Sequence, residues 1–123
     1  MTSGILKLAI EEAESSKYFP YRIGAVIFKG PRILSSGHNQ IRCSSIHRKY
    51  KEYESSLHAE QDALIGLDWS RLSGSSICVI RLNLNGSLRM ARPCDMCMKA
   101  LSFVGIKKIY YSNHNGEIIS EKI

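Results

Sequence analysis

The sequence predicts a layered α/β fold in which helices cover the faces of a mixed β-sheet. Segments with helical periodicity alternate with short β-rich runs along the 123 residues, and such alternation is typical of a sheet covered by helices. Turn residues separate neighbouring β-rich runs, which predicts hairpins. Only four residues, Asn113–Gly116, separate the last two predicted strands. These strands should therefore run antiparallel, because a parallel crossover needs a dozen residues or more.

The first half of the chain is predicted to contain a helix, a hairpin and a long loop. Apolar side chains recur at helical spacing over residues 3–17, with Ser3 as the predicted N-cap. The β-rich runs Tyr21–Phe28 and Arg32–Gly37 flank a turn at Lys29-Gly30-Pro31, so we expect a hairpin. The polar stretch that follows, up to residue 56, should form a loop at the mouth of the functional site.

The second half is predicted to contain two more helices and the remaining strands. The expected elements are, in order, a helix over 57–68, a strand over 77–84, an Asn85-Gly86 hairpin turn, a short strand over 87–91, a helix over 94–104 that stops at Gly105, and strands over 106–112 and 117–123.

Length and composition predict one globular domain over residues 1–123. Hydrophobic residues make up 44% and charged residues 23% of the chain, which is ordinary for a protein with one buried core. The first residues show neither a signal peptide nor an apolar membrane span. Two of the four cysteines have metal-ligand spacing, which favours a reducing, cytoplasmic location over disulfides. Cys78 lies in the apolar run ICVI and is expected in the core.

Two short motifs carry the predicted chemistry. His58-Ala59-Glu60 and Pro93-Cys94-Asp95-Met96-Cys97 supply one imidazole, two thiols and one carboxylate outside the ligand set. One histidine and two cysteines suit a tetrahedral Zn²⁺ ion with one open position, where a bound water becomes a nucleophile near neutral pH. Glu60 is not needed as a ligand and is placed to carry protons. The pattern is that of zinc-dependent nucleobase deaminases.

The spacing within the motifs predicts that two helix N-termini converge on the metal. Cys94 and Cys97 are three residues apart and would face the same way on the first turn of a helix. Pro93 suits the start of that helix, whose dipole favours thiolates. His58 and Glu60 would open the second helix, which carries an apolar stripe.

Two other interpretations of the cysteine pair stay open. A C-x2-C pair also occurs in structural zinc sites, where a fourth protein ligand closes the shell. Here that ligand would come from Cys43, Cys78, His38, His47 or His114. A redox-active pair is less favoured, because it should follow a strand near the start of a thioredoxin-like unit.

With these motifs the chain resembles the cytidine deaminase-like superfamily, in the branch with histidine as the first ligand. The resemblance runs from about Ile5 to Tyr111 and includes the segments IGAVIF, SSGHNQ, LHAEQDAL, ARPCDMCMKAL and GIKKIYYS. It implies a three-layer α/β/α fold with a mixed five-stranded sheet. It also implies roles for six residues: His58, Cys94 and Cys97 as zinc ligands, Glu60 as the proton shuttle, and Asn39 and Ala59 in substrate binding. Arg92 departs from the family's pattern, in which a small or acidic residue precedes Pro-Cys, and it either binds a substrate phosphate or points to solvent.

The resemblance also implies the reaction and the assembly. We expect a hydrolytic deaminase that converts a cytosine-type base, in a nucleoside or nucleotide, to uracil and ammonia, in a homo-oligomer. Many polynucleotide and tRNA deaminases of the superfamily carry a helix before a parallel last strand. Free-nucleoside deaminases, together with some toxin deaminases that attack nucleic acid, resemble the antiparallel form that this sequence predicts.

The basic charge balance leaves a polynucleotide substrate as an alternative. The chain has 17 Lys and Arg against 11 Asp and Glu, a net charge of +6, which suits an anionic partner. The densest basic patch, in the loop 42–53, also holds Tyr50 and Tyr53, and such a patch either contacts nucleic acid or is a solvated loop. The alternatives are therefore a deaminase acting on cytosine or adenine in single-stranded DNA or RNA, and a non-catalytic zinc-stabilised binding module. No membrane partner is expected.

Overall fold

The computed structural model describes residues 1–17, 21–39, 59–64 and 67–123, with Glu60 and Gln61 described by their backbone alone. Its elements are α1 (Ser3–Ser15), β1 (Arg22–Lys29), β2 (Arg32–His38), α3 (Ala59–Leu64), the 3-10 helix η1 (Trp69–Arg71), β3 (Ser76–Leu82), β4 (Leu88–Arg89), α4 (Asp95–Phe103), β5 (Lys108–Ser112) and β6 (Ile118–Lys122).

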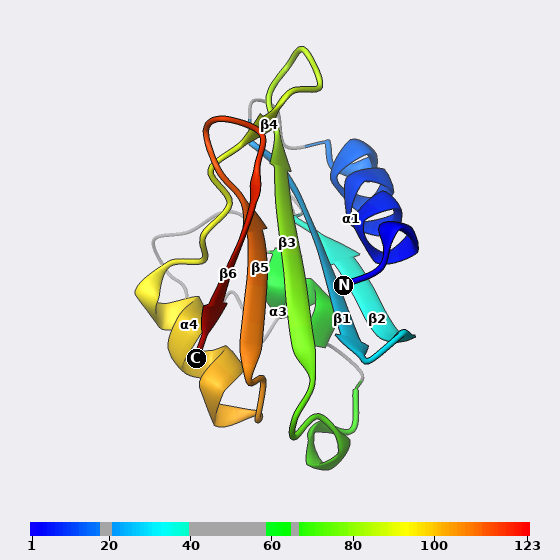
Figure 1. Ribbon diagram of the computed structural model, residues 1–123, viewed down its shortest axis with the longest axis vertical. Coiled ribbons are helices and arrows are strands. Elements are labelled where there is room, and N and C mark those ends of the chain that lie inside the picture. Colours follow the sequence, from blue (N-terminus) through cyan, green and yellow to red (C-terminus); the bar gives the residue numbers. More distant parts are fainter. Residues whose placement is uncertain (18–20, 40–58, 65–66) are drawn as a thin grey trace.

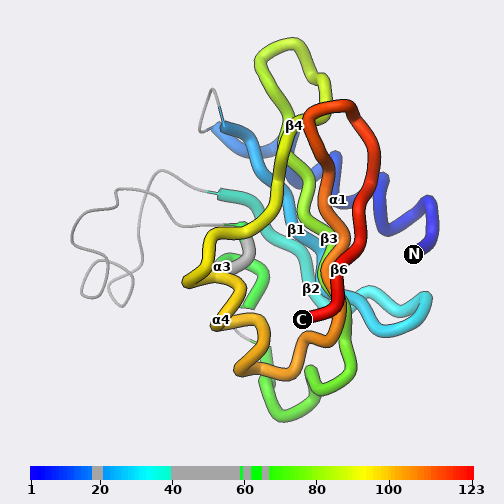
Figure 2. The backbone as a smooth tube through the Cα atoms, turned by 60° about the vertical axis from the view of Figure 1, so that its left-hand side comes forward, coloured from blue at the N-terminus to red at the C-terminus, as the bar shows by residue number. Residues whose placement is uncertain are grey.

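The fold is a mixed sheet between two helical layers, as the sequence predicted (Figure 1). The strand order is β2-β1-β3-β5-β6, and the two-residue β4 adds a sixth strand by pairing with the end of β3. Figure 2 shows α1 on one side of the sheet and α3 with α4 on the other. The five-stranded prediction therefore describes the main path of the sheet, to which the short β4 is added.

Two apolar clusters, one on each face, hold the layers together. Because successive side chains of a strand point to opposite faces, Ala25 and Ile27 of β1 pack with α3 and α4, whereas Val26 and Phe28 pack with α1. The same alternation places Val79 in the first cluster and Cys78 in the second. The sheet is thus buried on both sides at its centre, as its near-continuous apolar strands indicate.

The strand directions confirm the predicted hairpins. Strand β1 runs antiparallel to β2 and β3, β3 runs parallel to β5, and β5 runs antiparallel to β6. The β5–β6 turn closes through Gly116, whose φ of +79° favours glycine. The side chain of Asn113 stabilises this turn, because its Oδ1 accepts hydrogen bonds from the backbone N–H groups of Asn115 and Glu117, both 2.9 Å away.

Two predicted helix boundaries were wrong. The N-cap of α1 is Thr2 rather than Ser3, because the Thr2 hydroxyl accepts the backbone N–H of Ile5 at 3.3 Å. The helix predicted over 57–68 is α-helical over Ala59–Leu64, and the chain then turns into η1. Asp68 starts that turn, because its carboxylate accepts the backbone N–H and the hydroxyl of Ser70. Residues 57 and 58 lie outside the described residues.

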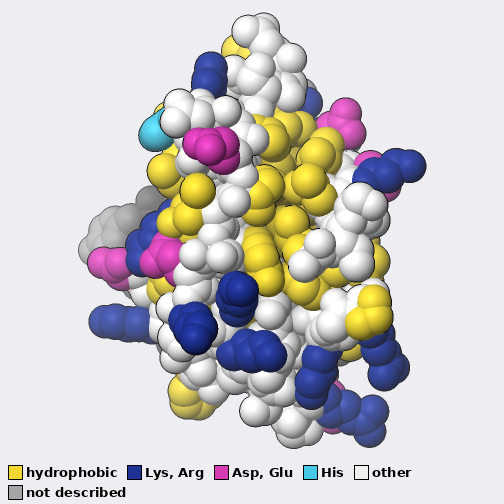
Figure 3. Space-filling view, in the orientation of Figure 1, with side chains coloured by type: hydrophobic (Ala, Val, Ile, Leu, Met, Phe, Trp, Pro, Cys, Tyr) yellow, Lys and Arg dark blue, Asp and Glu magenta, His cyan; other side chains and the backbone are white. Residues whose placement is uncertain are grey.

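Helix α1 covers only part of its face of the sheet. It packs against β1, β2 and β3, while Tyr110 of β5 and Ile118 of β6 lie at the border of the same apolar cluster and stay half-buried. In the space-filling view, hydrophobic side chains gather on this face beside α1 (Figure 3). No helix in the described part of the chain is long and apolar enough to cross a membrane.

Candidate metal centre and active site

The two predicted cysteine ligands lie at the N-terminus of α4. Cys94 is the N-cap, with extended backbone angles and an exposed side chain, and its carbonyl accepts the N–H of Met98 at 2.9 Å. Cys97 follows in the first turn and is 2% exposed. The helix predicted to begin at Cys94 begins one residue later, at Asp95, so Pro93 precedes the N-cap. Both thiols nevertheless lie at the positive end of the helix dipole.

The second motif enters the structure at the start of α3. Ala59 is the first residue of α3 and is 0% exposed within the cluster shared with α4. Glu60 follows it in the helix. His58 and the side chain of Glu60 lie outside the described residues. The start of α3 and the later turns of α4 therefore pack into the same apolar layer, on the face of the sheet opposite α1.

Strand β2 fixes α3 in place through close backbone contact. The hydroxyl of Ser35 donates to the carbonyl of Ala63 at 2.7 Å, and the carboxylate of Asp62 accepts the N–H of His38 at 3.0 Å. Gly37 lies between them, and a Cβ at this position would come within 2.6 Å of the Ala63 nitrogen. The helix can approach the strand this closely only because residue 37 has no side chain.

The described donors fit a zinc ion. The Cys94 thiol makes no side-chain hydrogen bond to its own helix, so its sulfur is not committed to capping. Thiolate is a preferred zinc ligand, and two thiolates need one further donor and an open position for a catalytic site. Within the described residues no three His, Cys, Asp or Glu side chains form a metal site; the third predicted ligand, His58, is outside that part of the chain.

Three of the candidates for a fourth protein ligand lie elsewhere. Cys78 is fully buried in the cluster on the α1 face, and burial raises the pKa of its thiol to about 12. His38 also faces α1, because its Nδ1 lies 2.9 Å from a carboxylate oxygen of Glu12. His114 is exposed in the β5–β6 turn. Cys43 and His47 lie outside the described residues.

Asn39, predicted to contact substrate, is buried and bonded to its own chain. Its Oδ1 accepts the Ile23 N–H at 2.9 Å and the Ser16 hydroxyl at 2.6 Å, and its Nδ2 donates to the Tyr21 carbonyl at 2.5 Å. These bonds tie the end of β2 to the start of β1 and to the end of α1. One hydrogen on Nδ2 remains for any further partner, so a predicted substrate contact would use that hydrogen.

Arg92, also predicted to contact substrate, lies two residues before Cys94 and forms an ion pair. Its Nε lies 2.9 Å from a carboxylate oxygen of Glu121 in β6, and the Tyr111 hydroxyl donates to the same oxygen at 2.5 Å. The Arg92 hydrogen bond, followed by that of Tyr111, lowers the pKa of Glu121. This arrangement connects the segment before Cys94 to the last strand of the sheet.

The structure adds one residue that the sequence reasoning missed. Arg81 of β3 follows Ile77 and Val79 on the α3 and α4 face and lies opposite Ile23 of β1. Its Nε is buried without a hydrogen-bond partner among the described residues, and its guanidinium lies 4.4 Å from the centroid of the Tyr21 ring. The signal was an arginine in the apolar run ICVIRL at a position that alternation turns toward the motif helices.

Arg81 and Tyr21 line a pocket of about 310 Å³ together with Asn83, Leu84 and Asn85. The pocket lies at the end of the sheet where Tyr21 receives the hydrogen bond from Asn39. A cation stacked on an aromatic ring beside two amide side chains offers contacts for a base and for an anion.

Comparison with known proteins agrees with the geometry. The family described as the cytidine and deoxycytidylate deaminase zinc-binding region matches residues 2–113. No curated protein sequence matches the chain. A cytidine deaminase structure from Burkholderia pseudomallei superposes with a TM-score of 0.69 at 17% identity, covering 99% of this chain and 93% of that one.

The apo structure of the dCMP deaminase from cyanophage S-TIM5 superposes with a TM-score of 0.59 at 27% identity, covering 93% of this chain and 86% of that one. The structure of the same enzyme in complex with dCMP and dUMP gives a TM-score of 0.57 at 24% identity, covering 93% and 85%. The family pattern spans nearly the whole chain, and the fold is that of its solved relatives. The chain belongs to the family of the cytidine and deoxycytidylate deaminase zinc-binding region.

Proposed function

We propose that the protein is a zinc-dependent hydrolytic deaminase that converts the cytosine-type base of a nucleoside or nucleotide to uracil with release of ammonia. The observation that carries the proposal is the thiol pair of Cys94 and Cys97 at the start of α4, because it belongs to the layer that also holds the start of α3. Membership of the cytidine and deoxycytidylate deaminase family supports the same reaction class.

In this proposal His58, Cys94 and Cys97 hold the metal. A bound zinc ion supplies positive charge and a water molecule that is acidic enough to act as a nucleophile near neutral pH. The Glu60 carboxylate takes a proton from the attacking water and delivers it to the ring nitrogen beside the amino-bearing carbon. It then takes a second proton from the hydroxyl group added to that carbon and transfers it to the departing amine, so that the carbonyl forms as ammonia leaves, as a general acid–base group does. The backbone at Ala59 and the remaining Nδ2 hydrogen of Asn39 orient the base or its sugar.

Two observations support a small pyrimidine nucleoside or nucleotide as the substrate. The antiparallel β5–β6 hairpin argues against the polynucleotide and tRNA deaminases with a helix before a parallel last strand, and it is a form that free-nucleoside deaminases share with some toxin deaminases. The phage relative was solved in complex with dCMP and dUMP. Within the described residues, our candidate for a phosphate or base contact is Arg81, because its buried Nε has no hydrogen-bond partner there. Arg92 is less available for such a contact, because it already pairs with Glu121.

Ammonia release tests the reaction. The purified protein would be assayed with cytosine, cytidine, deoxycytidine, their monophosphates, guanine and single-stranded oligonucleotides. We expect turnover of a cytosine nucleoside or nucleotide, and Glu60→Gln should reduce it by about 10²–10⁴-fold while zinc stays bound. Glu11→Gln, at an exposed position of α1, is the matched control and should retain full turnover. Loss of zinc in Glu60→Gln would refute the proton-shuttle role.

The same assay separates the alternatives. If only oligonucleotides are deaminated, the substrate is a polynucleotide, and its binding should weaken steeply with salt because several phosphates are neutralised. Neutralising Arg42, Arg48, Lys49 and Lys51 together should then flatten the salt dependence by about one unit for each phosphate that is no longer bound; these residues lie outside the described part of the chain. If zinc binds and no substrate releases ammonia, the protein is a binding module.

A further inference from the structure

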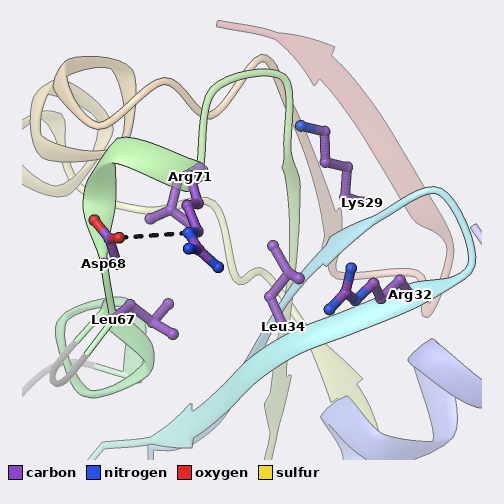
Figure 4. Close-up of a pocket in the computed structure, with 7 residues that line it drawn as sticks. Lys29, Arg32, Leu34, Leu67, Asp68 and Arg71 are labelled. Atoms are coloured by element: carbon purple, nitrogen blue, oxygen red, sulfur yellow. Dashed lines mark ion pairs between the residues drawn. The ribbon is translucent and has the colours of Figure 1, made fainter.

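A second pocket lies away from the candidate active site, beside the β1–β2 turn. Its volume is about 410 Å³, and it is lined by Lys29, Arg32, Leu34, Leu67, Asp68, Arg71 and Leu72 (Figure 4). Leu67 follows the C-terminal end of α3, whereas the metal motif is at the N-terminal end of that helix. The pocket is therefore separated from the motif by the length of α3.

Two of its cations face each other across the hairpin. Lys29 and Arg32 are register partners in the antiparallel β1–β2 pair, so their side chains leave the sheet on the same face. Like charges directly opposite each other destabilise a hairpin. Lys29 Nζ donates to the carbonyl of Ser73 at 3.0 Å, which keeps this cation at the rim of the pocket. An anion bound between the two side chains would remove the repulsion.

A third cation completes the arrangement from the opposite wall. Arg71 of η1 extends toward Leu34 from the side opposite the Lys29 and Arg32 side chains (Figure 4). Its Nε lies 3.5 Å from a carboxylate oxygen of Asp68 in an exposed ion pair, and such pairs are weak. Asp68 already accepts two hydrogen bonds from Ser70. Among the lining residues, one carboxylate thus faces three cations.

The floor of the pocket is apolar. Leu34, Leu67 and Leu72 also line it, and Leu72 is 2% exposed. A ligand that carries both an anionic group and an apolar or ring-shaped part would use both surfaces. Arginine suits phosphate in particular, because its planar guanidinium can donate two parallel hydrogen bonds to one phosphate group. A volume of about 410 Å³ is in the range of small-ligand sites.

We propose that this pocket binds a phosphorylated small molecule, with Lys29, Arg32 and Arg71 holding the phosphate and the three leucines contacting its apolar part. The site is independent of the deaminase reaction, since it shares no residue with the metal motifs. A concave pocket favours a small ligand over a nucleic acid strand, which tracks an extended groove.

Binding of phenyl phosphate and of inorganic phosphate, followed by NMR shifts of backbone amides, tests the proposal. We expect shifts at residues 29–34 and 67–73, with phenyl phosphate binding more tightly than inorganic phosphate because it also reaches the leucines. Lys29→Gln/Arg32→Gln and, separately, Arg71→Gln should weaken binding of phenyl phosphate about tenfold or more. The control Lys7→Gln/Lys107→Gln removes the same charge at exposed positions and should change affinity less than about twofold, because exposed charges contribute weakly.

Three results would overturn it. The first is that phenyl phosphate changes no backbone amide shift at residues 29–34 and 67–73. The second is equal weakening by the control variant, which would mean that binding reflects net charge alone. The third is binding of an oligothymidylate at these residues with no binding of phenyl phosphate, which would identify a nucleic acid surface. An independent readout is thermal stability without ligand, which Lys29→Gln/Arg32→Gln should raise by relieving repulsion and the control should leave unchanged.

Discussion

At the scale of single residues, the three described cysteines have different environments. Cys78 lies in the core on the α1 face, where burial disfavours the thiolate and raises its pKa to about 12. Cys94 is exposed at the N-cap of α4, and Cys97 is buried in the first turn of the same helix. Because zinc binds thiolate, only the pair on α4 among these three lies where a metal can be held.

Replacing each cysteine in turn distinguishes a zinc ligand from a core residue. We expect Cys94→Ala and Cys97→Ala each to lose bound zinc, measured by metal analysis of the purified protein. Cys78→Ala should keep its zinc and lose about 1 kcal/mol of stability, the usual cost of a small core truncation. Full zinc content in Cys94→Ala or Cys97→Ala would exclude that residue as a ligand.

The Arg92–Glu121–Tyr111 contacts predict how stability depends on pH. The pKa of Glu121 is lowered, mainly by the Arg92 hydrogen bond, so its contribution is present above its unfolded pKa of about 4.3 and is lost as the pH falls through the folded value. The pKa of Tyr111 is raised, mainly by its hydrogen bond to Glu121. Its contribution is therefore present below about pH 10 and is lost as the pH rises through its folded pKa.

Urea unfolding across pH measures both effects. Glu121→Gln should be less stable than wild type between about pH 5 and 9, and the difference should shrink toward both extremes. Tyr111→Phe should remove the alkaline part and should also reduce the acid part, because the Tyr111 hydroxyl contributes to the lowered pKa of Glu121. Glu11→Gln, exposed on α1, should follow wild type throughout. A constant difference between Glu121→Gln and wild type at every pH would contradict this assignment.

At the scale of elements, two glycines allow helices to lie directly on strands. A Cβ on Gly24 of β1 would come within 2.2 Å of the Ala9 carbonyl oxygen of α1, and one on Gly37 of β2 within 2.6 Å of the Ala63 nitrogen of α3. Both neighbours are backbone atoms, which cannot rotate away as a side chain can. The position of each helix therefore depends on a glycine in the strand beneath it, because a side chain there would collide with the helix backbone.

Alanine at Gly24 and Gly37 should show which of the two helices, α1 or α3, is needed for turnover. We expect Gly24→Ala and Gly37→Ala each to lower the free energy of unfolding by about 1–3 kcal/mol. Only Gly37→Ala should also reduce turnover at temperatures where both variants are folded, because α3 begins with Ala59 and Glu60. Gly4→Ala, whose Cβ would lie 3.8 Å from the Thr2 hydroxyl, is the control and should not destabilise. Equal turnover in Gly24→Ala and Gly37→Ala would show that catalysis does not depend on the position of α3.

At the scale of the whole molecule, the sheet joins two motifs that are far apart in sequence. The segment that ends in Cys94 is attached to the last strands, since Ala91 N–H donates to the Ser112 carbonyl at 2.9 Å and Arg92 pairs with Glu121. The other motif, at the start of α3, is attached to β2, which is the edge strand on the opposite side of the sheet from β6. A metal bound by both motifs would therefore cross-link two separate parts of the fold.

Metal removal tests this cross-link. We expect chelation to lower the thermal unfolding midpoint by about 10 °C, because a ligand present at about a thousand times its dissociation constant stabilises the folded state by about 4 kcal/mol. Zinc added back should restore the midpoint, as measured by circular dichroism or calorimetry. An unchanged midpoint after zinc has been removed completely would show that the ion does not link the two helices.

The sequence alone determined the layered fold, the antiparallel β5–β6 pair and the zinc motifs. These features follow from local periodicity, from a turn too short for a crossover, and from the spacing of donor residues. It did not predict the Thr2 cap, the early end of α3 or the N-cap position of Cys94. Each of these depends on which competing hydrogen bond forms, and neighbouring residues offer similar choices.

The tertiary structure alone decided which distant residues meet. Asn39 is held by Ser16, Tyr21 and Ile23, Arg92 pairs with Glu121, and Lys29 lines one pocket with Arg71. Such pairs are separated along the chain by turns and strands, and they depend on sheet order and register. A shift of one residue in register would turn each strand side chain to the other face of the sheet, so no local pattern in the sequence specifies these contacts.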